Sequence, residues 1–140
     1  MPDDQDYGGP WLQAAGFCEK VLLEKDGVAS LIRMVDRFTV TAAGAGASEK
    51  MPPTNLNITA FISLKSGFAR GSVELKLVGR NPSQQVFSTA NLPLFLEGDD
   101  RGALAVLEMT LQVSEDGLYW FDVLLGGRLL TRMPLRVIYQ

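Results

Sequence analysis

The sequence predicts an all-β protein, an antiparallel β-sandwich of about eight strands. Three observations support this class. Short segments alternate apolar and polar side chains with a period of two, turn-forming residues separate these segments, and no long stretch has convincing helical periodicity. At 140 residues, with 46% apolar and 21% charged residues, the chain has the size and composition of one globular domain.

The start of the chain differs in composition from the rest. The segment 1–12 combines glycine and proline with three acids, Asp3, Asp4 and Asp6. Such a segment has little to bury, so we expect a flexible acidic tail at 1–12, in which Trp11 is the residue that docks back. A single β-sandwich domain is expected to follow at 13–140.

The stretch FCEKVLLEKDGVASLIRMVDRFTVT, residues 17–41, predicts two strands. Asp26-Gly27 between them accepts the positive φ values that a tight hairpin turn requires. A helix remains the alternative, because EKVLLEK also has helical spacing. The segment 42–55 is rich in alanine and glycine and is broken by proline, which predicts a long connection: either a crossover between sheets or a functional loop.

Two further strands are expected in the middle of the chain. NLNITAFISLKSG, residues 55–67, and GSVELKLVG, residues 71–79, both alternate with period two. The polar and glycine residues at 64–71 predict a turn between them, and Asn81-Pro82-Ser83 predicts another after the second strand.

The segment QQVFSTANLPLFLEG, residues 84–98, predicts a strand in which Pro93 marks an edge, a bulge or an end, since proline cannot donate to a ladder. GDDRG at 98–102 predicts a loop, and LEMTLQV at 107–113 predicts the next strand. The acids around this loop offer oxygens to a hard cation such as calcium, but they lack the spaced ligands of a dedicated calcium loop. A solvated turn is therefore the expectation for Glu97, Asp99 and Asp100.

The last quarter of the chain predicts a hairpin. In GLYWFDVLL, residues 117–125, the odd positions are apolar, whereas Trp120 and Asp122 share the other face. After Gly126-Gly127 the odd positions are again the apolar ones, from Leu129 onward. We therefore expect the odd face of both strands to be the core.

The register of this hairpin follows from the same pattern. A plain two-residue loop would set Phe121 beside Arg132 and so mix core with charge. Either a three-residue loop or a bulge restores parity. We predict that Phe121 pairs with Met133 and that Asp122 faces Arg132.

Tyr119 lies at the start of the hairpin in the pattern Glu115-x-Gly117-x-Tyr119-x-Phe121. This pattern looks like the tyrosine corner of immunoglobulin-type sandwiches, with phenylalanine where antibodies have cysteine. In that motif the tyrosine hydroxyl bonds to backbone a few residues upstream. The predicted sandwich is therefore immunoglobulin-like, and the aromatic stretch is core rather than a binding platform.

Three pieces of the chain occur together in one kind of sequence: FCEKVLLEKDGVASLIRMVDRFTV, LKSG-x-x-RG at 64–71, and DGLYWFDVLLGGRLLTRMPLRVIY with its R-x-P-x-R-V ending. Over most of its length the chain thereby resembles a family of small uncharacterised bacterial β-sandwich proteins, a domain of unknown function. The resemblance implies the sandwich and supplies no catalytic, cofactor or binding residue. The chain departs from the pattern at the turn, where Gly126 replaces an expected aspartate or asparagine.

The composition excludes several classes of function. The chain has no histidine and a single cysteine, Cys18, which removes Ser-His-Asp and Cys-His catalysis, histidine-ligated metals and cysteine clusters. The net charge of -3 comes from the tail, because the acids outside it equal the 13 bases, so no basic surface for nucleic acid is expected. No apolar run reaches bilayer length and no secretory signal is evident. We expect a cytoplasmic protein that is not an enzyme, contacts no membrane and uses no cofactor or metal.

Four residues are candidate binding residues. Trp120 is the aromatic that the alternation leaves outside the core, and with Arg132 it offers a stacking surface. Lys65 and Arg70 flank Ser66-Gly67, where backbone N–H groups and two bases can hold an anion. The alternative for both pairs is an ordinary solvated strand face and ordinary turn chemistry.

The sequence leads to two functional hypotheses. The first is a non-enzymatic protein–protein interaction or assembly module, with an unknown partner or a homodimer formed through an exposed sheet edge or face. The second is a module that binds a small ligand or carbohydrate through Trp120 or Trp11 and a neighbouring arginine. An exposed apolar surface favours the first, and a concave site lined by these side chains favours the second.

Overall fold

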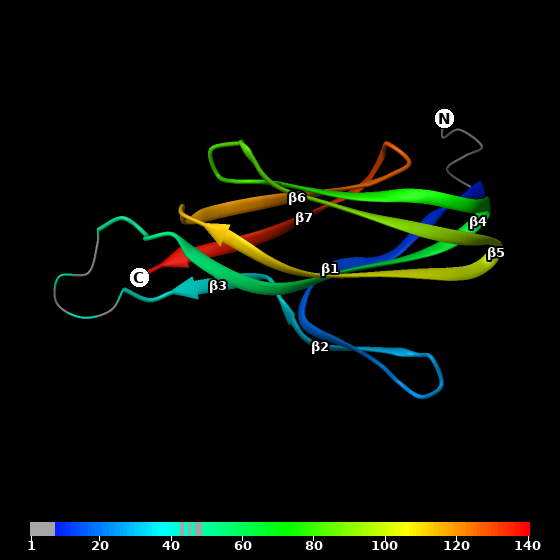
Figure 1. The fold of residues 1–140 in the computed structure, drawn as a ribbon, viewed down its shortest axis with the longest axis horizontal. Helices are drawn as coiled ribbons and strands as arrows, with labels where there is room; N and C mark the ends of the chain where they lie inside the picture. The colour runs from blue at the N-terminus through cyan, green and yellow to red at the C-terminus, as the bar shows by residue number, and fades with distance from the viewer. Residues whose placement is uncertain (1–7, 43, 45, 47–48) are drawn as a thin grey trace.

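The computed structural model describes residues 8–42, 44, 46 and 49–140, and most of these residues lie in strands (Figure 1). The strands are β1 (Trp11–Leu23), β2 (Ala29–Val35), β3 (Arg37–Val40), β4 (Thr54–Arg80), β5 (Val86–Val113), β6 (Gly117–Leu125) and β7 (Arg128–Tyr139). None of the described residues forms a helix long and apolar enough to cross a membrane. The protein is nearly all-β, as the alternation predicts.

The strands follow the order β2-β1-β4-β6-β7-β3, and β5 pairs with β4. Every pair is antiparallel except β3 and β7, which run parallel from Arg37 opposite Arg136 to Val40 opposite Tyr139. The prediction of a wholly antiparallel arrangement is therefore wrong at this edge. The chain enters β3 directly from β2, with one residue between them, so no hairpin fixes the direction of β3 against β7.

The described residues form seven strands where about eight are predicted, because two expected turns lie inside strands. The expected turn at 64–71 belongs to β4, and the expected loop at 98–102 belongs to β5. The β4–β5 register shifts between Lys65 and Arg70, which marks bulges in a continuing ladder. Three glycines in this region have positive φ, so both strands bend without ending: Gly67, Gly71 and Gly98.

The bend gives the two halves of β4 different neighbours. The first half pairs with β1 as far as Lys65, and the second half pairs with β6 from Leu75 onward. Figure 1 shows the β4–β5 ladder folding back on itself at its right-hand end. The long β4–β5 hairpin therefore belongs to two groups of strands, β2-β1-β4 and β4-β6-β7-β3. In both groups β5 is the strand at the edge, beside β4.

The core is held together by aromatic rings from three strands. The ring of Phe121 in β6 lies 5.0 Å from Phe17 in β1 and 5.8 Å from Phe87 in β5, and Phe87 lies 5.2 Å from Tyr119. All these contacts are edge-to-face, the geometry that aromatic quadrupoles favour. Phe121 is fully buried, so it joins the β1 side of the core to the β6 side.

The predicted register of the β6–β7 hairpin is confirmed. Phe121 pairs with Met133 and Asp122 with Arg132, and a shift beside Val123 restores parity beyond the Gly126-Gly127 turn. The odd positions of β6 from Tyr119 to Leu125 are buried, as predicted. On β7, Met133, Leu135 and Val137 are buried, whereas Leu129, which precedes the bulge, is 50% exposed.

The N-terminal hairpin is confirmed, and the helical alternative is wrong. β1 and β2 pair antiparallel around a turn in which Gly27 has a φ of 84°. β1 begins at Trp11, which pairs with Lys65 and lies near the end of the segment 1–12 that was expected to be a tail. Residues 1–7 of the expected tail lie outside the described residues. The long connection ends at Pro53, because β4 begins at the next residue.

The β5 strand lies at an edge, as one interpretation of Pro93 predicts. Among the described residues β5 pairs with β4 alone, and Pro93 stands opposite Glu74. The turn before β5 also matches the prediction: the Gln84 N–H donates to the Asn81 carbonyl, and the Gln85 N–H donates to the Asn81 side chain.

Candidate functional site

Two predicted site residues, Trp120 of β6 and Arg132 of β7, lie together on the outer face of the sheet. The Arg132 guanidinium lies 5.8 Å from the Trp120 ring centroid and donates to Asp122 at 2.7 Å. Arg80 of β4 lies 3.8 Å from the other oxygen of Asp122. Asp122 is only 15% exposed, so one carboxylate bridges two cations from neighbouring strands. These contacts hold Trp120 and Arg132 in place on the sheet.

Of the predicted pair Lys65 and Arg70, Arg70 is held by groups of β5. Arg70 donates to the Glu97 carbonyl at 2.7 Å and to the Asp99 carboxylate at 3.1 Å. The Ser66 hydroxyl is buried and donates to the Arg101 carbonyl. These bonds tie β4 to β5 across the bend.

The backbone beside Ser66 is also covered. A Cβ atom added to Gly67 would overlap the Gly8 carbonyl oxygen and lie 2.9 Å from the Gly9 Cα. The N-terminal segment therefore lies directly on the bend. Phe68, which follows Gly67, contacts Gly8 and is otherwise 84% exposed.

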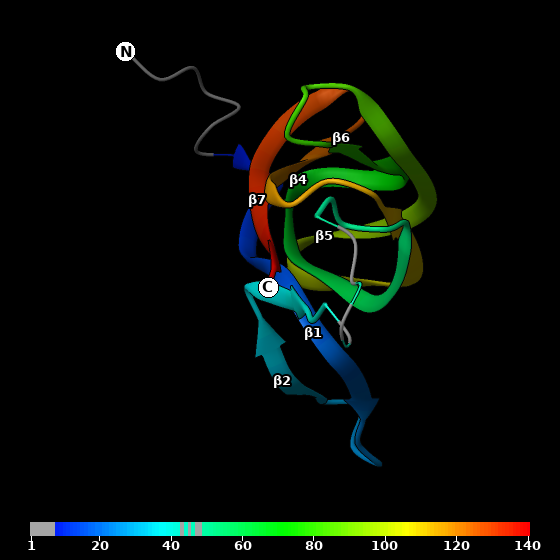
Figure 2. The same ribbon diagram turned by 90° about the vertical axis from the view of Figure 1, so that its left-hand side faces the viewer.

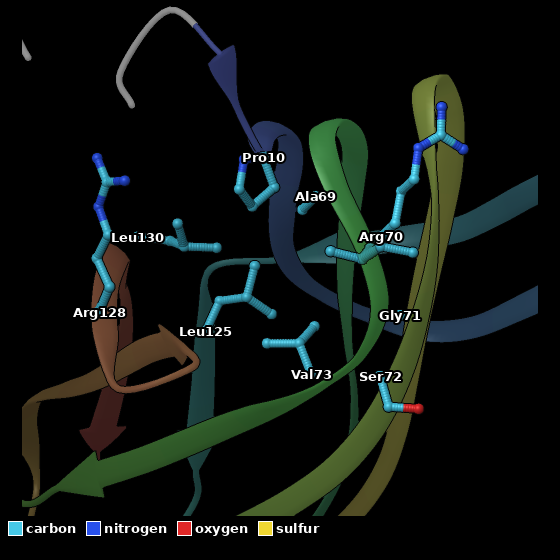
Figure 3. A pocket seen from close by; sticks show the side chains of 10 residues that line it. Pro10, Ala69, Arg70, Gly71, Ser72, Val73, Leu125, Arg128 and Leu130 are labelled. Atoms are coloured by element: carbon cyan, nitrogen blue, oxygen red, sulfur yellow. The ribbon is translucent and has the colours of Figure 1, made fainter. Parts of the chain in front are cut away.

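Arg70 also lines a pocket of about 300 Å³ (Figure 3). Its apolar walls come from the N-terminal segment, the β4–β5 bend and the β6–β7 hairpin: Pro10, Ala69, Val73, Leu96, Leu125 and Leu130. Arg70 and Arg128 line it as well, and Figure 3 shows them on opposite sides of the apolar side chains. Sequence reasoning identified Arg70 but not the pocket, because its walls meet only when the β4–β5 ladder bends.

A second surface stands away from the body of the protein. The far part of β1 and the whole of β2 form a hairpin that projects from the other strands (Figures 1 and 2). Its large apolar side chains are exposed on both faces. Exposed fractions range from 37% to 72% for Leu22, Leu23, Val28, Leu31, Ile32 and Met34.

The three sheet edges differ in how they resist further pairing. β5 carries Pro93 and a run of charged residues at its bend, and β3 has four residues only. β2 has seven residues with one charge, Arg33, which is 3.3 Å from Glu19 of β1. Proline, charge and shortness are the usual protections of an edge strand, and β2 has the fewest of them.

Tyr119 and Cys18 are buried groups with structural contacts. The Tyr119 hydroxyl donates to the Glu115 carbonyl at 2.6 Å, and burial raises the pKa of this phenol above its ordinary value. Burial likewise raises the pKa of the Cys18 thiol, which disfavours the reactive thiolate. Across the described residues, no three cysteine or carboxylate side chains gather where they could hold a metal ion.

Two of the solved structures that are similar to this chain illustrate the likeness. An immunoglobulin-like protein from Pseudomonas aeruginosa is 16% identical, with 92% of this chain and 96% of that chain covered and a TM-score of 0.43. An alkylpurine DNA glycosylase from Pseudomonas fluorescens, bound to DNA that contains an abasic site analog, is 10% identical, with 89% of this chain and 30% of that chain covered and a TM-score of 0.43. No protein family and no curated protein matches the sequence. The strand pairing and side-chain contacts of the chain itself therefore carry the functional argument.

Proposed function

We propose that this protein is an immunoglobulin-like β-sandwich that works without catalysis, by self-association through the β2 edge. The strand neighbours support the sandwich. The second half of β4 with β6 and β7 reproduces the neighbour order of strands C, F and G, and the first half of β4 with the second half of β5 corresponds to strands B and E. The Tyr119 bond to Glu115 supports a tyrosine corner at the start of strand F.

The observation that carries the assembly proposal is the apolar, weakly protected edge of the projecting hairpin. Leu31 and Ile32 are 37% and 38% exposed in a strand whose outer backbone groups have no neighbouring strand among the described residues. Such an edge is a template for another strand, and its apolar side chains gain free energy when they leave water.

A second copy of the chain is the partner that this edge fits. Two copies of β2 can pair antiparallel about a two-fold axis, so that each offers the other the same unpaired backbone groups and the same apolar side chains. Arg33 has a φ of 53°, which interrupts the regular strand and leaves Ala29–Ile32 as the pairing segment. This segment has no charge, and the nearby Arg33 is paired with Glu19, so the approach of two copies brings no unpaired like charges together.

The Ile32→Lys variant tests this proposal. Wild-type protein is expected to be dimeric by light scattering at high concentration and to dissociate on dilution. A lysine in each copy would place like charges in the paired edges, so Ile32→Lys is expected to raise the dimer Kd by about tenfold or more, at a cost of at least about 1.4 kcal/mol.

Val86→Lys is the matched control, because Val86 is 51% exposed at the start of β5, away from the hairpin. It should leave the dimer Kd unchanged. A wild-type protein that is monomeric throughout the dilution series, or equal effects of the two substitutions, would refute self-association through β2.

A further inference from the structure

We propose that the pocket between the β4–β5 bend and the β6–β7 turn binds a small uncharged apolar molecule, the size of one aromatic ring or a short alkyl chain. None of its described lining residues belongs to the projecting hairpin, so this site is independent of self-association through β2. Three observations support this class of ligand: the chemistry of the walls, the directions of the charged side chains and the volume.

The side chains that form the interior of the pocket are apolar. Leu96 and Leu125 are 2% and 6% exposed, so the floor belongs to the core and keeps its shape. Val73 and Leu130 pack against the same core, and the ring of Pro10 completes the walls (Figure 3). None of these five side chains can form a hydrogen bond with water. An apolar molecule that displaces water from them therefore gains free energy.

The polar side chains at the rim leave this interior without a charge. Arg70 donates to the Glu97 carbonyl and to the Asp99 carboxylate, which holds its guanidinium toward β5. Figure 3 shows the guanidinium groups of Arg70 and Arg128, and the hydroxyl of Ser72, directed away from the apolar side chains. No acidic side chain is among the described residues that line the pocket. A charged group that entered would lose its hydration and gain no partner, so a charged ligand is disfavoured.

The volume sets the size of the ligand. About 300 Å³ is at the lower end of the range for small-molecule pockets, which suits one ring or a short chain and excludes a long lipid. The walls come from three separate parts of the chain, and one of them is Pro10 of the N-terminal segment. A bound molecule therefore also favours the state in which this segment lies on the bend.

Titration of the full-length protein with toluene, followed by methyl NMR, tests the site. Saturable shifts are expected at the methyl groups of Val73, Leu125 and Leu130. Benzoate and benzylamine carry the same ring with a negative and a positive charge, and the Kd of each is expected to be at least about tenfold higher than that of toluene. Benzoate that binds as tightly as toluene, or no saturable binding of toluene, would overturn the proposal.

Two pairs of variants locate the binding. Ala69→Leu should raise the toluene Kd by about tenfold or more, because the larger side chain fills the space between the walls, whereas Ala14→Leu, at an exposed position of β1 outside the pocket, should leave it unchanged. Val73→Ala should raise the Kd by about threefold through the loss of apolar contacts. Val78→Ala, on the same strand but outside the pocket, should not. If Ala69→Leu fails to fold, the second pair decides, and equal Kd values within it would refute the site.

Discussion

Phe121→Ala is expected to lower the free energy of unfolding by about 3–5 kcal/mol, which is the usual cost of removing a buried aromatic ring. Phe121 has no exposed surface, and its ring contacts Phe17 and Phe87. The substitution therefore removes the ring that joins β1, β5 and β6. Since single domains are stable by about 5–15 kcal/mol, a large part of the folded protein's stability should be lost.

Urea unfolding at one fixed protein concentration measures this loss, because self-association would otherwise change the apparent stability. Trp120→Ala is the matched control, one residue away on the outer face of the same strand and only partly buried. Its cost should be clearly smaller than that of Phe121→Ala. Equal costs would contradict the assignment of the odd positions of β6 to the core.

Gly67→Ala is expected to cost about 2 kcal/mol or more. Gly67 has a φ of 61°, a conformation in which a Cβ atom costs about 1–2 kcal/mol. The added methyl would also collide with the Gly8 carbonyl, which is backbone and cannot turn aside as a side chain would. The N-terminal segment must then leave the bend, and with it Pro10, a wall of the pocket.

Gly127→Ala separates the two causes. Gly127 has a φ of 85°, but an added Cβ would meet no atom within 4 Å. Thermal or urea unfolding of both variants should therefore show a larger loss for Gly67→Ala. Equal losses of stability would mean that the contact between Gly8 and Gly67 contributes nothing.

Alternation along the chain was sufficient to predict the parts of the fold that depend on one face of a strand. The core face of β6 and the pairing of Phe121 with Met133 follow from the rule that a one-residue slip exchanges the faces. The β1–β2 hairpin follows in the same way from Asp26-Gly27 between two apolar segments. These are local patterns, and the sequence contains them in full.

The bend in the β4–β5 ladder could not be predicted in this way. Glycine at 67, 71 and 98 indicates positive φ, but a tight turn and a bulge in a continuing strand require the same residue. After a tight turn the chain reverses and pairs with the strand just formed, whereas after a bulge it continues the same ladder. Which of the two occurs depends on partner strands that are distant in the sequence. For the same reason the pocket, which the bend creates, was not predicted, although Arg70 was named.

The projecting hairpin exposes a second limit of pattern reading. Leu31, Ile32 and Met34 have the composition of a core strand, and nothing in the local sequence distinguishes a strand buried in its own fold from one that awaits a partner. Exposure appears only when β2 is found at the end of the strand order. The hypothesis of an exposed edge was therefore available from the sequence, but its location was not.

Amide hydrogen exchange in β2 tests self-association through this edge most directly. In Ala29–Ile32, alternate N–H groups point toward β1 and away from it. The outward groups are expected to be protected at concentrations where the protein is dimeric and to lose that protection on dilution, while the groups bonded to β1 keep theirs. Outward amides that exchange freely in a solution shown to be dimeric would place the interface elsewhere and contradict the proposed function.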